Sequence, residues 1–251
     1  MRLKDKVALV TGGSRGIGRA IVLAFAGEGA KVAIASRNKE RCDELVAQIE
    51  KKGGSALSIK ADVASETDVK RMVKLATDKF QRVDILVNCA AVNLPYRAVT
   101  ELSLDEWNWI MGVNLTGTFL ACRAVLPQMM ARRSGKIINI ASIGGRLGAA
   151  GRTPYRPSKA AVINFTYCLA AEVKEFNIDV NAICPGAVET DMLREITEGK
   201  LPEHMMPPSD IAAVAVFLAS DESRAVTGTA IDAFGPSNPL FGASTSVHRV
   251  K

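Results

Sequence analysis

The sequence predicts an α/β fold in which a doubly wound parallel sheet of about seven strands carries helices on both faces. Short apolar runs alternate with amphipathic segments from the start of the chain, which is the pattern of repeated βαβ units. The runs lack the polar alternation of a half-exposed strand, so both faces of the sheet are expected to be covered. No stretch has the composition of a linker, and the 251 residues are therefore expected to form one domain, residues 1–251.

Seven short segments have the apolar character of buried strands. They are Val7–Val10, Val32–Ala35, Ser55–Ala61, Val83–Val87, Lys136–Ala141, Asp179–Ile183 and Thr229–Ala233. Between them, apolar residues recur at helical spacing, as in Val69, Met72, Val73, Ala76 and Phe80. The alternation of the two patterns is what a doubly wound sheet requires.

Composition and charge argue against several other classes of protein. Hydrophobic residues make up 48% of the chain and charged residues 23%, which is typical of a globular protein. The net charge of +6 is spread along the sequence without a block of like charges, so no nucleic-acid partner is expected. Apolar runs such as Ile211–Ala219 are too short to span a membrane, and the first residues lack the pattern of a signal peptide. Five cysteines without a C-x-x-C pair indicate reduced thiols in a cytoplasmic protein, and two separated histidines predict no metal site.

Two predicted helices are apolar around most of their circumference. They lie within Leu115–Met130 and Ala160–Ala171. One side of each helix can cover the sheet, and the other side needs a second apolar surface. A second copy of the chain would supply that surface, so we expect a homo-oligomer, either a dimer or a tetramer. Burial inside one large monomer is the alternative.

A glycine-rich turn follows the first strand and opens the next helix. The segment T-G-G-S-R-G-I-G places glycines at Gly12, Gly16 and Gly18. Such a turn lets the backbone approach a pyrophosphate, and the free N–H groups at the helix start attract its negative charge. Strand, turn and helix occur in the order that dinucleotide binding requires, whereas glycine alone would indicate only a tight turn.

The end of the second strand distinguishes two dinucleotide cofactors. An acidic residue here would bind the ribose 2′-hydroxyl of NAD. This chain has Ser36 and Arg37 instead, and an arginine can hold the 2′-phosphate of NADP through two parallel hydrogen bonds. Arg15, in the glycine-rich turn, could reach the same phosphate. The sequence therefore favours NADP(H), with NAD(H) as the alternative if both arginines are merely solvated.

Tyr155 and Lys159 are one helical turn apart in the segment T-P-Y-R-P-S-K-A. Residues at this spacing share a helix face. A lysine ammonium about 4 Å away would lower the phenol pKa from about 10 by about 3 units, which would suit general acid–base catalysis. Pro157 fits a helix only within its first turn, so the helix is expected to begin close to Pro154–Tyr155. Arg156 precedes a proline and is expected to distort this start.

Together these segments resemble the short-chain dehydrogenase/reductase family, and the similarity covers nearly the whole chain in the family's order. The matching motifs are T-G-x-x-x-G-x-G at 11–18, Asp62-Val63, Asn88-Cys89-Ala90, Asn114, Ser142, Y-x-x-x-K at 155–159 and P-G-x-x-x-T at 185–190. The resemblance implies a Rossmann fold and an oxidoreductase that transfers a hydride between nicotinamide and a ketone or secondary alcohol. A non-catalytic NADP(H) sensor is the alternative, although it would have little need of Ser142, Tyr155 and Lys159.

By this resemblance, four residues form the catalytic group. Tyr155 is the general acid in reduction and the base in oxidation, and Lys159 lowers its pKa and binds the nicotinamide ribose. Ser142 hydrogen-bonds the substrate oxygen, and Asn114 holds a water in the proton relay. The cofactor site would comprise Gly12, Ser14, Arg15, Ile17, Gly18, Ser36, Arg37, Asp62, Val63, Asn88, Ala90, Tyr155, Lys159, Pro185, Gly186, Val188 and Thr190. The substrate site would add Gly144 and Met192 to Ser142 and Tyr155.

The substrate class is less clearly indicated. The general similarity is to 3-oxoacyl-carrier-protein reductases and to alcohol, sugar and polyol dehydrogenases. Arg133 matches a basic position with which carrier-protein reductases meet an acidic partner, but Phe176 stands at the second such position, so acyl carrier protein is only one candidate partner. Arg146 and Arg152 are candidates for attracting an anionic substrate.

Three departures from the family pattern stand out. Ala91 replaces a usual glycine, and the segment Ile231–Pro236 replaces the usual V-D-G-G, which puts the family's C-terminal subunit contact in doubt. The stretch 187–210, which forms a lid over the substrate in relatives, is short. A short lid predicts an open or differently closed pocket.

Overall fold

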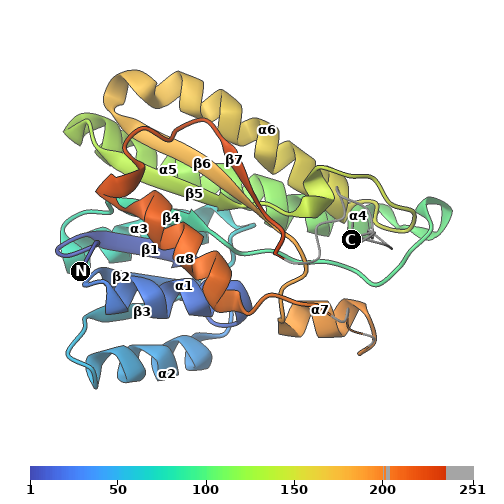
Figure 1. Cartoon of the computed structure of the whole chain (residues 1–251), viewed down its shortest axis with the longest axis horizontal. Helices are drawn as coiled ribbons and strands as arrows, with labels where there is room; N and C mark the ends of the chain where they lie inside the picture. Colours follow the sequence, from blue (N-terminus) through green and yellow to red (C-terminus); the bar gives the residue numbers. More distant parts are fainter. Residues whose placement is uncertain (200, 202–203, 236–251) are drawn as a thin grey trace, which may run out of the picture.

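The computed structural model describes residues 1–199, 201 and 204–235, and these form the predicted parallel sheet (Figure 1). The strand order is β3-β2-β1-β4-β5-β6-β7, and every neighbouring pair is parallel. The strands are β1 (Val7–Thr11), β2 (Lys31–Ser36), β3 (Ala56–Lys60), β4 (Ile85–Asn88), β5 (Gly135–Ile140), β6 (Ile178–Pro185) and β7 (Ala230–Ala233). Their bounds agree with the predicted segments to within one or two residues.

Helices cover both faces of the sheet, as predicted (Figure 1). One face carries α1 (Gly16–Gly27), α2 (Lys39–Glu50) and α8 (Pro208–Ala219). The other carries α3 (Glu66–Phe80), α4 (Leu104–Met111), α5 (Gly117–Arg132) and α6 (Tyr155–Val173). The short helix α7 (Asp191–Ile196) stands apart from both layers. Single turns lie at η1 (Val99–Glu101), η3 (Ile143–Gly145), η4 (Lys174–Phe176) and η5 (Asp221–Ser223), and a π-helical turn, η2 (Gly112–Thr116), joins α4 to α5.

The hydrophobic core is divided into two layers by the sheet. In β1, Val7 and Leu9 pack with the α3–α6 side, whereas Ala8 and Val10 pack with the α1, α2 and α8 side. Successive strand residues point to opposite faces, so a strand covered on both faces is apolar at most positions. This is the physical reason why the strands appear as continuous apolar runs in the sequence.

The strand order creates a crevice beside β1. The strands β2 and β3 continue the sheet on one side of β1, and β4 to β7 continue it on the other. The chain passes from β1 to α1 on one face, and from β4 toward α4 on the opposite face. In such a sheet, ligands bind at the carboxyl ends of the strands where the connections diverge.

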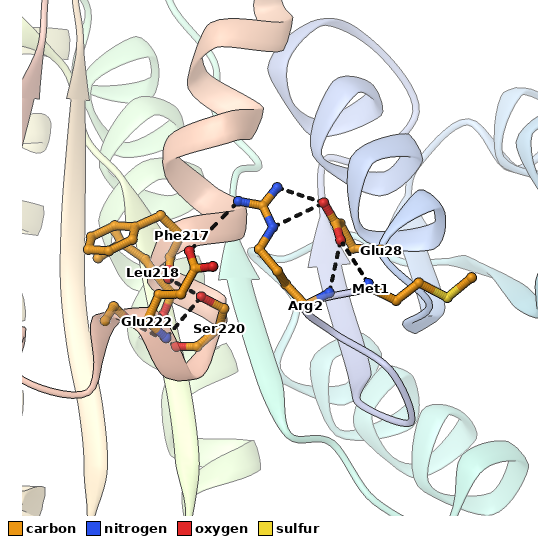
Figure 2. Close-up of polar contacts among 8 residues, drawn as sticks. Met1, Arg2, Glu28, Phe217, Leu218, Ser220 and Glu222 are labelled. Carbon is orange, nitrogen blue, oxygen red and sulfur yellow. Dashed lines mark hydrogen bonds and ion pairs between the residues drawn. The ribbon is translucent and has the colours of Figure 1, made fainter.

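The N-terminus is held at the opposite, amino-terminal edge of the sheet. Figure 2 shows the Arg2 guanidinium between Glu28, at the end of α1, and Glu222, in η5 after α8. The Arg2 guanidinium approaches the Glu28 carboxylate to 2.6 Å and that of Glu222 to 3.8 Å, and the Arg2 backbone N–H also donates to Glu28 at 2.9 Å. Exposed ion pairs contribute little to stability. Here these contacts hold the N-terminal segment beside the ends of α1 and α8.

One continuous helical run is apolar over an unusual length. Residues Leu104–Arg132, which include α4, η2 and α5, have a mean hydropathy of 1.3 over an 18-residue window, and half of that window is buried inside the protein. By length and composition this run could cross a membrane, but the core helix of a globular protein passes the same test. Its packing against α3 and α6 in one layer of the core makes it such a core helix here.

Candidate active site

A cavity of about 420 Å³ lies at the carboxyl ends of the strands, at the predicted crevice. Its walls come from the glycine-rich turn after β1, the segments that follow β2 to β6, the start of α6, and α7. These parts are distant in sequence and meet only because parallel strands all end at the same edge.

The glycine-rich turn has a shape that side chains would prevent. Gly12 has a φ of +65°, and a Cβ there would lie 2.7 Å from the backbone of Ala90. A Cβ on Gly18 would lie 2.2 Å from the Gly12 carbonyl oxygen. The helix α1 begins at Gly16 without a side-chain cap and without an acidic residue in its first turn. Its N–H groups are therefore available to an anion in the cavity.

The predicted phosphate-binding residues gather beside this turn. The Ser14 and Ser36 hydroxyls are 2.8 Å apart, and Arg37 is exposed at the cavity edge with no ion pair among the described residues. Arg15 is already engaged, because its guanidinium lies 2.6 Å from the Glu195 carboxylate and 3.9 Å from that of Asp191, both on α7. The helix α7, in the segment after β6, is thus joined by ion pairs to the glycine-rich turn across the cavity. Of the two predicted states, an open or a differently closed pocket, these contacts favour the second.

The helix α6 begins at Tyr155, as predicted. Pro157 is its third residue, where a missing N–H has no helical partner to lose. The expected distortion at Arg156 is absent, since this residue is helical and its N–H donates to the Arg152 carbonyl at 3.0 Å. That carbonyl fixes the start of the helix from outside and overrides the local preference imposed by the proline.

Lys159 lies one turn into α6 and is almost completely buried. Its Nζ donates to the Ile140 carbonyl at 2.8 Å and lies 5.8 Å from the centre of the Tyr155 ring. Burial disfavours the charged form and lowers the Lys159 pKa from 10.5 to about 8. The predicted pair is therefore present, with the ammonium directed to the end of β5.

The predicted direction of the Tyr155 pKa shift is wrong for the protein without a cofactor. Burial raises the Tyr155 pKa, and the neighbouring Ser142 hydroxyl only partly opposes this rise. The prediction from the sequence rested on the attraction of the lysine charge, whereas desolvation of the buried phenol is the larger effect in the folded protein.

Ser142 stands at the start of η3, directly after β5. Its Oγ accepts the Gly144 N–H at 3.0 Å, and both residues line the cavity together with Tyr155. A Cβ on Gly145 would lie 2.8 Å from the Lys159 carbonyl carbon, so glycine at this position lets η3 pack directly onto α6. The close packing keeps Ser142 beside the Tyr155 end of the helix.

Two predicted site residues, Asn88 and Asn114, do not line the cavity. Asn114 lies in the π-helical turn η2, where its side chain accepts the Val92 N–H at 2.8 Å and donates to the Val92 carbonyl and the Ser158 hydroxyl, both at 3.0 Å. Asn88 is buried and donates to Asn139 at 2.9 Å. The Asn114 amide therefore positions the segment after β4 and the start of α6, and the Asn88 amide links β4 to β5. The other predicted catalytic, cofactor and substrate residues all line the cavity.

The sequence of residues 6–201 matches the family described as short chain dehydrogenase. The chain belongs to the short-chain dehydrogenase family. It is therefore an oxidoreductase that uses a nicotinamide cofactor on carbonyl or hydroxyl groups.

Relatives of this short-chain dehydrogenase cover almost all of the chain. The 3-oxoacyl-[acyl-carrier-protein] reductase of Synechocystis sp. is 37% identical over 240 residues, which are 93% of this chain and 97% of the relative. The 3-oxoacyl-[acyl-carrier-protein] reductase of Thermotoga maritima is 38% identical over 239 residues, which are 92% of this chain and 97% of the relative. Among solved structures, 3-ketoacyl-(acyl-carrier-protein) reductase from Brucella melitensis in complex with NADH has a TM-score of 0.88 at 33% identity, covering 93% and 98%. Levodione reductase has a TM-score of 0.88 at 30% identity, and the match covers 92% of this chain and 96% of that protein.

The two arginines proposed from the sequence for an anionic substrate have different roles in this dehydrogenase. Arg146 does not line the cavity, because its guanidinium binds the Asp232 carboxylate at 3.0 Å and the Ala230 carbonyl at 2.8 Å, which ties η3 to β7. Arg152 does line the cavity. Arg156 also lines the cavity, but it was not predicted from the sequence as a residue of the site. The available signal was its position next to Tyr155 on the first turn of the same helix.

Proposed function

We propose that the chain transfers a hydride between NADP(H) and a ketone or secondary alcohol, with Tyr155 as the proton donor in reduction and acceptor in oxidation. The observation that supports this most strongly is the gathering of Ser142, Tyr155 and Lys159 in the cavity that also contains the glycine-rich cradle. A protein that only senses a nucleotide needs the cradle but not these three side chains. The bound nicotinamide supplies or accepts the hydride.

Each of the three side chains has a defined task in this proposal. The Ser142 hydroxyl, presented at the end of β5, donates a hydrogen bond to the substrate oxygen and orients the carbonyl toward Tyr155. Tyr155 moves the proton to or from that oxygen. Lys159 has a pKa of about 8 and is mostly protonated at neutral pH, so it supplies positive charge beside the phenol. Among the described residues the Lys159 ammonium donates to the Ile140 carbonyl and to no side chain, and hydroxyls of a cofactor ribose would give it further hydrogen-bond acceptors.

The preference for NADP(H) rests on the end of β2. Ser36 and Arg37 line the cavity there, and neither is a carboxylate that would repel a 2′-phosphate. Arg37 has its guanidinium donors available, whereas Arg15 would have to exchange Glu195 for the phosphate. NAD(H) is the alternative, and it is supported by the Brucella melitensis relative, which was solved in complex with NADH.

A 3-oxoacyl thioester is one candidate substrate, supported by the names of the curated relatives. Acyl carrier protein would then be the partner. Arg133, the predicted contact, is exposed after α5, and its guanidinium lies 5.8 Å from the centre of the Phe176 ring. One basic residue stacked on an aromatic ring is a smaller attraction for an acidic protein than two basic residues would be. Neutral or carboxylate-bearing ketones are therefore tested beside thioesters.

We further propose a cytoplasmic homo-oligomer, a dimer or tetramer, formed through the helices on the α4–α6 side. Large apolar side chains are exposed there: Leu104 (72%), Trp109 (42%), Phe119 (41%) and Tyr167 (37%). Light scattering should give a mass that is a multiple of 26.8 kDa. Phe119→Asp should shift it toward the monomer, and a monomeric wild-type protein would refute the proposal.

The decisive experiment is a substrate panel run in both directions with both cofactors. Purified protein should reduce at least one class among cyclic ketones, short oxo acids, their esters and 3-oxoacyl thioesters, and NADPH should support the higher kcat/KM. If no ketone were reduced and no alcohol oxidised while NADPH still bound, the sensor function would replace the catalytic one.

A further inference from the structure

The cavity contains two arginines whose charge the cofactor site does not use. Arg152 and Arg156 are half-buried and line the cavity; Arg152 lies just before α6 and Arg156 is the second residue of that helix, directly after Tyr155. The glycine-rich turn and the α1 N-terminus, which would hold the cofactor phosphates, are formed by a different part of the wall. The two arginines therefore belong to the region where the substrate must approach Tyr155.

Neither arginine has an acidic partner among the residues that the structure describes. Arg152 donates to the Leu94 carbonyl at 3.4 Å, and Arg156 donates to the Leu147 carbonyl at 2.6 Å. A guanidinium has five N–H donors, so most of the donors of each remain available. Arg146, only a few residues away, is by contrast neutralised by Asp232 at 3.0 Å. Among the described residues, Arg152 and Arg156 thus line the cavity without a carboxylate paired to either.

The two charges act on each other. Burial lowers the Arg156 pKa, and the positive charge of Arg152 lowers it further. Like charges held near one another in a partly desolvated site repel, and an anion bound between them relieves the repulsion. Carboxylates suit this task because their two oxygens match the geometry of a guanidinium.

The position of Arg156 places this charge beside the reacting group. The Arg156 Cγ and the Ser142 Oγ lie 3.1 Å and 3.3 Å from the position that a Cβ would take on Gly144. The Arg156 Nε lies 3.7 Å from the same position, so the stem and the start of the guanidinium border Gly144 as the Ser142 hydroxyl does. The arginine and the serine that would bind the substrate oxygen therefore lie in the same part of the cavity.

We propose that the substrate carries a carboxylate close to its reacting carbonyl, and that Arg152 and Arg156 bind this carboxylate. The inference rests on the proposed function and narrows its substrate to oxo acids and the corresponding hydroxy acids. A phosphate at the far end of a pantetheine thioester has the same charge but is separated from the carbonyl by a long arm, so it would not reach Arg156 while the carbonyl contacts Ser142.

The test compares acids with their neutral esters in wild-type protein and in Arg152→Met and Arg156→Met. Acetoacetate and levulinate are assayed beside their methyl esters, and acetoacetyl-CoA beside acetoacetyl-N-acetylcysteamine, with saturating NADPH. For an acid, each substitution should lower kcat/KM about 10- to 100-fold, the size expected for a lost hydrogen bond to a charged group. For the esters the change should be small. Arg156→Lys, which keeps the charge, should recover part of the loss.

Two controls separate recognition from folding. Arg97→Gln removes an arginine that pairs with Glu106 at 3.3 Å outside the cavity, and it should leave the ratio of acid to ester turnover unchanged. NADPH affinity and the thermal midpoint of each variant report whether the cavity is intact. A variant that no longer binds NADPH is replaced by Arg156→Gln or Arg152→Gln, which keep a polar side chain of intermediate length.

The outcomes distinguish this inference from the proposed function. If esters and thioesters are reduced as well as the acids, and the substitutions affect all alike, the carboxylate site is refuted while hydride transfer stands. If only acetoacetyl-CoA depends on the arginines and its N-acetylcysteamine analogue does not, the anion is the phosphate and the inference is wrong. If no substrate is reduced, the binding of acetoacetate and levulinate to the NADPH complex is measured by NADPH fluorescence instead. Equal binding by wild type and both variants would then overturn the inference.

Discussion

Replacing Lys159 with methionine should make the cofactor-free protein more stable at neutral pH while abolishing turnover. Burial lowers the Lys159 pKa from 10.5 to about 8, which at 1.36 kcal/mol per pH unit corresponds to a destabilisation of about 3 kcal/mol when the lysine is charged. Methionine removes this term but leaves the Ile140 carbonyl without its 2.8 Å donor, a loss of about 1–2 kcal/mol. The net expectation at pH 7 is a gain of about 1–2 kcal/mol.

The pH dependence identifies the cause. Since the Lys159 pKa is lower in the folded chain than in the unfolded chain, the destabilisation is fully present below about pH 8 and disappears as the pH rises toward 10.5. The advantage of Lys159→Met should therefore shrink between these values. Urea unfolding at fixed protein concentration, at neutral pH and at the alkaline end of this window, measures it. Lys52→Met, at an exposed position, is the control. A Lys159→Met protein that is less stable at pH 7, or whose difference from wild type does not change with pH, would show that desolvation of the Lys159 ammonium does not destabilise the fold.

Three further changes test the cofactor site. In Gly18→Ala the new Cβ would lie 2.2 Å from the Gly12 carbonyl oxygen, so NADPH affinity should fall by at least about tenfold. Gly27→Ala is the control, because no atom lies within 4 Å of its new Cβ and NADPH affinity should be retained. Equal NADPH affinities of the two variants in a fluorescence titration would contradict the proposed role of the glycine-rich turn. Arg37→Asp should weaken NADPH more than NADH, and equal losses would rule out its contact with the 2′-phosphate. Glu195→Gln removes the shorter ion pair of Arg15 and leaves Asp191 at 3.9 Å, so NADPH binding should tighten by about two- to fivefold, as expected of a surface ion pair; unchanged affinity would contradict a contact between Arg15 and the phosphate.

The sheet could be predicted because burial on both faces leaves a direct trace in the sequence. A strand such as β1 is apolar at nearly every position, here Val7–Val10 with Thr11 at its end, and the repeated alternation of such runs with amphipathic segments is typical of a parallel sheet. The site could be predicted almost as well, since the strand ends define one edge and the motif residues follow those ends. Tyr155 at the helix start followed from the geometry of proline alone.

The failures share a physical origin in packing, which the sequence does not display. The Tyr155 pKa was predicted in the wrong direction because desolvation depends on how deeply both groups are buried. Asn114 was expected to face the cavity, but the π-helical turn η2 directs its amide to Val92 and Ser158. The anion-binding role could not be assigned between Arg146 and Arg152, because only the structure shows that Asp232 neutralises the former.

In the proposed reaction, Tyr155 carries the proton that accompanies hydride transfer. The most direct measurement compares wild type with Tyr155→Phe, using the best ketone of the panel and NADPH, together with a titration of NADPH binding. The value of kcat should fall about 10²- to 10⁴-fold while NADPH affinity stays near that of wild type, because the ring is kept and only the proton donor is lost. Turnover by Tyr155→Phe at the wild-type rate would show that Tyr155 does not carry the proton.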